Sequence, residues 1–134
     1  MAIELPDKVS KAIEEPQFWH LATVNPDGSP QVSTIWIMPK DGNILVNTAL
    51  GRKKPRNMDA NPHVALSWVD PENGYHCASI QGKVVDRYVG DQAEADIDAL
   101  AQKYLGQSPY PWRSPGEQRV TYVVEPLHVY HQDP

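Results

Sequence analysis

Apolar residues recur along this chain with two spacings, one typical of helices and one typical of strands. The clearest helical pattern runs from Asp91 to Leu105, where apolar positions fall three and four residues apart. Its apolar stripe consists of Ala93, Ile97, Leu100, Ala101 and Tyr104. Gly106 follows directly, so the helix is expected to end there. A shorter helix is predicted after Pro6, with Val9, Ala12 and Ile13 on one face and Glu15-Pro16 at its end.

Strand patterns occupy most of the remaining chain, and turns rich in Gly, Pro, Asn and Asp separate them. The predicted strands are 18–24, 31–38, 44–48, 63–69, 75–88 and 120–130. Within the long strand 75–88, Gly82 is expected to mark a bulge. Strands joined in hairpins, then a helix and a closing strand, predict a mainly β fold. We expect a small antiparallel barrel with short helices covering its ends, in a single domain spanning 1–134.

Basic residues are concentrated in one short segment. Arg52, Lys53, Lys54 and Arg56 are four of the twelve lysines and arginines of the chain. They follow the strand 44–48 and the turn residue Gly51, and they begin a short helix. Backbone N–H groups at a helix N-terminus are unpaired and favour an anion, and basic side chains add charge-assisted hydrogen bonds. The segment is therefore either a phosphate cradle or a solvated basic helix face, and its spacing alone does not separate the two.

The overall composition restricts what such a cradle would hold. The formal net charge is −5, which argues against a nucleic-acid-binding protein and favours a small phosphorylated ligand. Cys77 is the single cysteine, so the chain has no intrachain disulfide. The N-terminal residues lack the basic and apolar regions of a signal peptide, and no apolar run approaches the ~20 residues of a membrane span. These features predict a soluble, cytoplasmic protein.

Motifs for side-chain catalysis are scarce. The sequence contains no GxGxxG, no P-loop and no Gly-x-Ser-x-Gly elbow. His128 and His131 are three positions apart on a predicted strand, so their side chains should point to opposite faces, and no metal site is expected. Cys77 is interpreted as a half-buried structural residue. Catalytic residues stay unassigned, and difficult chemistry is expected to come from a bound cofactor.

Taken in order, several segments carry a resemblance to a known family. They are 19–36, which includes the Asn25-Pro26-Asp27-Gly28 turn, together with 47–54, 61–66 and 101–106. With these segments the chain resembles the pyridoxamine 5′-phosphate oxidase-like flavoproteins, and more narrowly the branch that binds the deazaflavin coenzyme F420. The resemblance implies a split antiparallel β-barrel of the FMN-binding type.

The resemblance also implies roles for particular residues. A strand corresponding to Ser33, Thr34, Ile35 and Trp36 lines the cofactor ring, largely through backbone groups. Asn47 and Thr48 match positions at the ribityl chain and phosphate. Gly51, Arg52, Lys53 and Lys54 match the phosphate-binding turn and basic cluster, with Asn57 as a further ligand. Family members form homodimers with both sites at the subunit interface, which would account for Trp36, Trp68 and Trp112. Ordinary core packing is the alternative account of each of these tryptophans.

Three functions follow from this resemblance. The vitamin-oxidising members carry an Arg where Ser108 follows Tyr104 here, so oxidation of pyridoxine phosphate is not expected. The leading hypothesis is an F420-dependent oxidoreductase that transfers hydride to a small conjugated organic substrate, because the acidic tail of that cofactor suits the basic cluster. An FMN-dependent oxidase or reductase is the second hypothesis. The third is a non-catalytic module that binds flavin, deazaflavin or haem.

Overall fold

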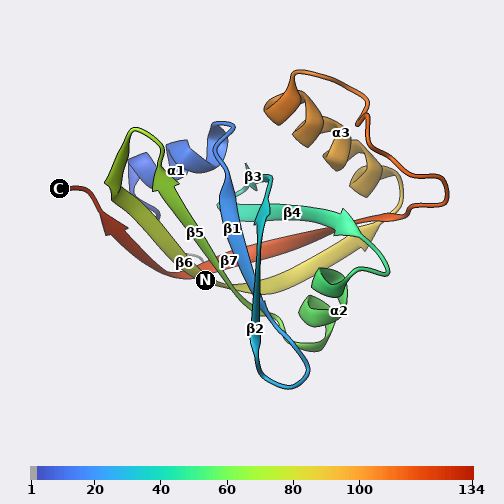
Figure 1. Cartoon of the computed structure of the whole chain (residues 1–134), viewed down its shortest axis with the longest axis horizontal. Coiled ribbons are helices and arrows are strands. Elements are labelled where there is room, and N and C mark those ends of the chain that lie inside the picture. The colour runs from blue at the N-terminus through green and yellow to red at the C-terminus, as the bar shows by residue number, and fades with distance from the viewer. Residues whose placement is uncertain (1–2) are drawn as a thin grey trace.

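The computed structural model describes residues 3–134 and forms one strongly curled, seven-stranded antiparallel sheet with three helices (Figure 1). Met1 and Ala2, at the start of the segment judged not to be a signal peptide, lie outside the described residues. The strands are β1 (Trp19–Val24), β2 (Pro30–Ile35), β3 (Ile37–Lys40), β4 (Asn43–Ala49), β5 (His63–Asp70), β6 (Asn73–Val89) and β7 (Arg119–Gln132). The helices are α1 (Asp7–Glu14), α2 (Lys53–Ala60) and α3 (Asp91–Leu105). The predicted mainly β split barrel is confirmed.

The strand predicted for 31–38 is in fact two strands that break at Trp36. The sheet order is β2-β1-β5-β6-β7-β4-β3, so β2 and β3 are consecutive in the chain but lie at opposite edges of the sheet. Alternating burial continues across the break, since Ile35 and Ile37 are both buried. For this reason the period-two pattern did not reveal the break. Trp36 thus crosses between the two edges where the curled sheet closes on itself.

The long strand β6 bends where the sequence predicted a bulge. Its register with β7 shifts between Gln81 and Gly82, and again between Val84 and Asp86. A Cβ atom added to Gly82 would lie 2.6 Å from Cγ1 of Val124. The absence of a side chain therefore lets β7 approach closely at this bend.

The core fills the inside of the curl. Trp19 is fully buried, stacks on Trp68 with ring centroids 6.1 Å apart, and donates its indole N–H to the carbonyl of Ala12. Trp68 is itself buried and donates to Gln17 Oε1. For Trp68 the structure therefore shows core packing, the alternative to an interface role, because its ring packs inside the protomer.

The helices flank the sheet at the positions predicted for them. Helix α3 spans the predicted range, and Gly106 ends it in the left-handed conformation with φ 70°. Figure 1 shows α2 and α3 on either side of the end of β4, whereas the C-terminus lies at the other side of the molecule. Within residues 3–134, no helix is both long and apolar enough to cross a membrane.

Candidate functional site: a basic, aromatic-walled hollow

A hollow of about 180 Å³ opens where β2, β4, the start of α2 and α3 meet, and we call it the junction hollow. Its lining includes seven residues that the sequence proposed: Thr34, Ile35, Trp36, Asn47, Thr48, Arg52 and Lys54. Ile97, Leu100, Tyr110, Trp112 and Arg119 complete it. The sheet curl therefore brings the predicted ring strand and the predicted basic turn to one place.

Four proposed residues do not line the junction hollow. Gly51 shapes the turn between β4 and α2, where its φ of 92° would strain any other residue. Ser33 follows the opposite face of β2 from Thr34, and its buried hydroxyl lacks a hydrogen-bond partner among the described residues. Lys53 is exposed and its charge acts on Asp27 in the β1–β2 turn.

Asn57 is the fourth of these residues, and the structure gives its side chain another task. It is buried and donates to Thr23 Oγ1 at 3.0 Å and to Asn25 Oδ1 at 2.9 Å. These bonds tie α2 to β1 and its turn. Because the amide is engaged there, it is directed away from the hollow that it was expected to serve.

Cations crowd at the basic side of the junction hollow. Burial lowers the pKa of Lys54, and repulsion from Arg52 and Arg119 lowers it further. Arg52 and Arg119 share Glu117, at 3.5 Å and 2.9 Å. Within residues 3–134, the Lys54 side chain makes no hydrogen bond or ion pair. An anion in the hollow would relieve this repulsion and supply the partner that Lys54 lacks.

The polar wall of the hollow is held rigidly by Arg119, which sequence reasoning missed. Arg119 is buried and donates from Nε to Asn47 Oδ1 at 2.9 Å. Asn47 in turn donates to the Ala93 carbonyl and to Thr121 Oγ1. Its amide is thus fully used in positioning Arg119. Beside it, the buried Thr48 Oγ1 has no partner among the described residues, so it is free to bond a ligand.

The opposite wall is aromatic. Trp36 stacks on Tyr104 with centroids 5.2 Å apart and an interplanar angle of 9°. Tyr110 and Trp112 pack against Trp36 at 6.1 and 6.0 Å, and Arg119 lies 5.3 Å over the Tyr110 ring. Tyr110 and Trp112 come from the Pro-rich segment 107–118, which shows no helix or strand periodicity. The sequence signal that could have placed them at a binding site was the presence of aromatic residues in such a segment. A wall of this kind suits a flat, conjugated ring.

The backbone of β2 adds a further binding surface. β2 is an edge strand that pairs with β1 alone among the described strands. Its other edge therefore presents unpaired N–H and C=O groups beside Trp36. This arrangement fits recognition of a ring through backbone groups.

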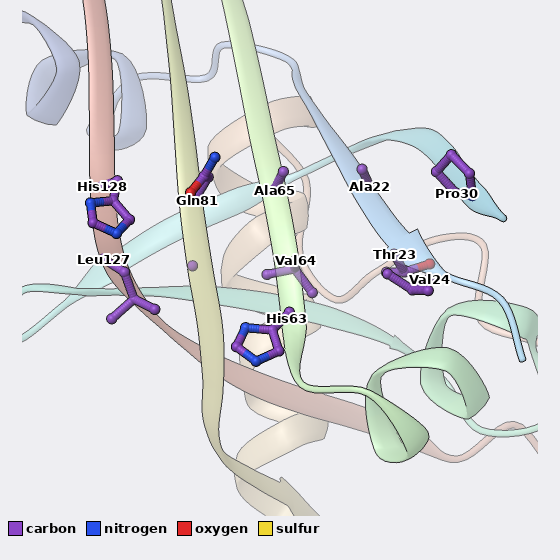
Figure 2. A pocket seen from close by; sticks show the side chains of 11 residues that line it. Ala22, Thr23, Val24, Pro30, His63, Val64, Ala65, Gln81, Leu127 and His128 are labelled. Carbon is purple, nitrogen blue, oxygen red and sulfur yellow. The ribbon is translucent and has the colours of Figure 1, made fainter. Parts of the chain in front are cut away.

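A second and larger hollow, the outer groove, runs across β1, β5, β6 and β7 and encloses about 440 Å³ (Figure 2). A row of cross-strand neighbours runs over β1, β5, β6 and β7: Ala22, Ala65, Gln81 and His128. His63, Val64 and Leu127 also line it. No Lys, Arg, Asp or Glu lines this groove among the described residues. The sequence did not predict it.

The fold is a split barrel, and its junction hollow combines cationic side chains with an aromatic wall. Residues 5–133 match the family model described as pyridoxamine 5′-phosphate oxidase, and this chain belongs to that family.

Solved structures give the same fold. An F420 reductase superimposes with a TM-score of 0.82 at 35% identity, covering 94% of this chain and 98% of that one. A conserved hypothetical protein from Mycobacterium tuberculosis follows with a TM-score of 0.70 at 19% identity, covering 98% and 86%. The haem storage protein HutZ from Vibrio cholerae has a TM-score of 0.64 at 14% identity, covering 97% and 96%. A search of the curated proteins found no match.

Proposed function

We propose that this protein is an F420-dependent reductase that delivers hydride to a small, conjugated organic substrate. The observation that carries the proposal is the meeting of Lys54, a cation without a partner, with the aromatic wall at Trp36 in one hollow. The 35% identity to an F420 reductase over nearly the whole chain supports the choice of cofactor.

The residues of the junction hollow fit such a cofactor in their chemistry. Lys54, Arg52 and the uncapped N-terminus of α2 would hold its phosphate. Thr48 Oγ1 would accept or donate one hydrogen bond to its polyol chain. Trp36 and the free edge of β2 would orient its ring. When bound, the deazaflavin supplies the hydride.

The chain itself contributes orientation and exclusion of water. Trp112 is 61% exposed and borders the hollow, so it is the group best placed to cover a substrate. The Tyr104 hydroxyl is already engaged, because it donates to the Gln17 carbonyl at 2.7 Å and accepts from the Ile37 N–H at 3.2 Å. Burial raises the pKa of Tyr104, which keeps this phenol neutral and structural rather than a general acid.

We also propose a homodimer in which a second copy completes the site. The junction hollow encloses about 180 Å³, below the roughly 300–1,000 Å³ usual for sites that bury a ligand of this size. The outer groove offers an apolar surface for the partner, and Val32, 64% exposed, extends it across β2 as the cross-strand neighbour of Ala22.

The test compares two adjacent lysines of α2. Lys54→Ala should weaken F420 binding by about ten- to a hundredfold, since a charge-assisted hydrogen bond contributes roughly 1.5–3 kcal/mol. Lys53→Ala removes the same charge from a side chain outside the hollow, and it should change the affinity by about threefold or less. Fluorescence titration of the purified protein with F420 and, separately, with FMN measures both.

Several outcomes would overturn the proposal. Tighter binding of FMN than of F420 would assign the protein to the flavin-dependent members. Equal losses in the two lysine variants would remove the junction hollow as the phosphate site. No binding of either cofactor at micromolar concentration would refute the reductase assignment.

A further inference from the structure

We propose that His76, His131 and Asp133 form a binding site for one divalent transition-metal ion, for which Zn²⁺ is the appropriate probe. We call these three residues the histidine cluster. It lies at the C-terminal end of β7, on the other side of the molecule from α2 and α3 (Figure 1). It shares no residue with the junction hollow or the outer groove, so it is independent of the proposed reductase function.

The register of β6 and β7 brings the three ligands together. Cys77 pairs with Gln132 and Ala78 with His131, so position 76 follows opposite position 133 at the end of the ladder. His131 is then the diagonal neighbour of His76. One ligand atom from each of the three residues lies within 4.8 Å of the others. A site built by cross-strand pairing has no spacing signature along the chain.

The two imidazoles face each other through the nitrogens that bind metals. His76 Nε2 lies 3.0 Å from His131 Nε2. Tetrahedral coordination with Zn–N bonds of about 2.0–2.1 Å places two such nitrogens about 3.3 Å apart. A side-chain movement of a few tenths of an ångström therefore makes room for the ion. Asp133 would supply the third ligand and leave a fourth position for water.

Asp70 prepares His76 for this role. Its Oδ2 lies 3.0 Å from His76 Nδ1, so that nitrogen carries the proton and donates it to the carboxylate. In the neutral ring, His76 Nε2 then carries the lone pair that faces His131. A carboxylate behind a histidine fixes the tautomer and orientation needed for metal binding. His131 Nε2 lies 3.0 Å from His76 Nε2, and both nitrogens must be free of a proton when they bind the ion.

An ion can reach the site from solvent. His76 is 8% exposed, and it opens onto a polar hollow of about 490 Å³ between α1 and the β5–β6 turn. Lys8, Asp70 and Glu72 also line this hollow. Asp133 is exposed and pairs with Lys8 at 2.7 Å. The Lys8 ammonium is thus paired with the carboxylate that the metal would use. Lys8 therefore competes with the metal ion for Asp133.

The experiment titrates the full-length protein, made without a polyhistidine tag and freed of metal with a chelator, with Zn²⁺ in a calorimeter. One Zn²⁺ per chain should bind. His131→Gln and Asp133→Asn should each weaken binding by about tenfold or more. His128→Gln is the matched control, because His128 lies three residues away on the same strand but lines the outer groove. It should leave the affinity unchanged.

Lys8→Gln gives a result of opposite sign. Removal of the competing cation should tighten Zn²⁺ binding several-fold, whereas a site that does not use Asp133 would not respond. Far-UV circular dichroism shows that each variant is folded. Failure of the unmutated protein to bind Zn²⁺ below about 100 μM would overturn the proposal and reduce the cluster to a histidine–histidine hydrogen bond. Equal losses for His131→Gln and His128→Gln would overturn it too, as adventitious binding to surface histidines.

Discussion

The junction hollow encloses about 180 Å³ and the outer groove about 440 Å³, yet only the smaller of the two gathers charged side chains. The junction hollow has Arg52, Lys54 and Arg119 on one wall and stacked aromatic rings on the other. It also holds Thr48 Oγ1, a buried oxygen without a hydrogen bond among the described residues. Such groups gain a partner when a polar ligand enters, so they favour the junction hollow as the proposed cofactor site more directly than its size does.

The outer groove owes its shape to small residues. Ala22 and Ala65 leave the sheet surface hollow between longer side chains such as Gln81 and His128 (Figure 2). A surface of this kind gains free energy when matching apolar side chains cover it, without any specific chemistry. The comparison therefore supports the proposals made above, in which the junction hollow binds the cofactor and the outer groove receives the partner subunit.

The largest effect is expected when Arg119 is removed from the polar wall of the junction hollow. Arg119→Met should lower the free energy of unfolding by about 3–5 kcal/mol, because it leaves the buried Glu117 carboxylate without its closest cation. F420 affinity should fall as well, since Asn47 loses the donor that it positions. Urea unfolding and cofactor titration measure the two losses.

Arg113→Met is the control for that prediction. Arg113 pairs with Glu94 and Asp98, but its side chain is 31% exposed and lies outside the hollow. Its loss should cost about 1 kcal/mol or less. Similar destabilisation in both variants would contradict the distinction drawn between the two arginines.

The next effect tests the outer groove as the assembly surface. Ala65→Arg inserts a long cation in the middle of the groove, so it should convert the proposed dimer into a monomer of 15.0 kDa. Val85→Arg on the same sheet is the control, because Val85 is 50% exposed but lies outside the groove. Sedimentation velocity at micromolar concentration distinguishes the two. A monomeric unmutated protein would refute the dimer itself.

The smallest effect sharpens the choice between cofactors. Arg56 is exposed one turn beyond the junction hollow, where its Nε donates to the Arg52 carbonyl. Arg56→Glu should weaken F420 binding several-fold through the acidic tail, and it should leave FMN binding nearly unchanged. The difference should shrink as salt is raised, because exposed charges are screened over about 10 Å at 0.1 M. Equal losses for both cofactors, or a loss independent of salt, would contradict this role.

Much of the fold was predictable because its signals are local. The stripe from Ala93 to Ala101 predicted α3, and Gly106 ended it, because both depend on neighbours within one or two turns. Likewise, a glycine inside the strand pattern, Gly82, indicated the bend of β6. The basic turn was also recognisable in the sequence as a cluster of Lys and Arg, and the structure places Arg52 and Lys54 in the junction hollow.

What the tertiary structure decided depends on partners that are distant in sequence. The sequence alone fixed the helices, most strands, the family and the position of the basic segment, since periodicity and turn chemistry are encoded over a few residues. It did not separate Lys53 from Lys54, or reveal that Asn57 is bound to Thr23 and Asn25. Nor did it bring Arg119 to Asn47 or His131 to His76, 72 and 55 residues apart. Those contacts exist only because the curled sheet sets its strands side by side. The order of the strands depends on pairing between distant segments, so the residue pattern within one segment does not predict it.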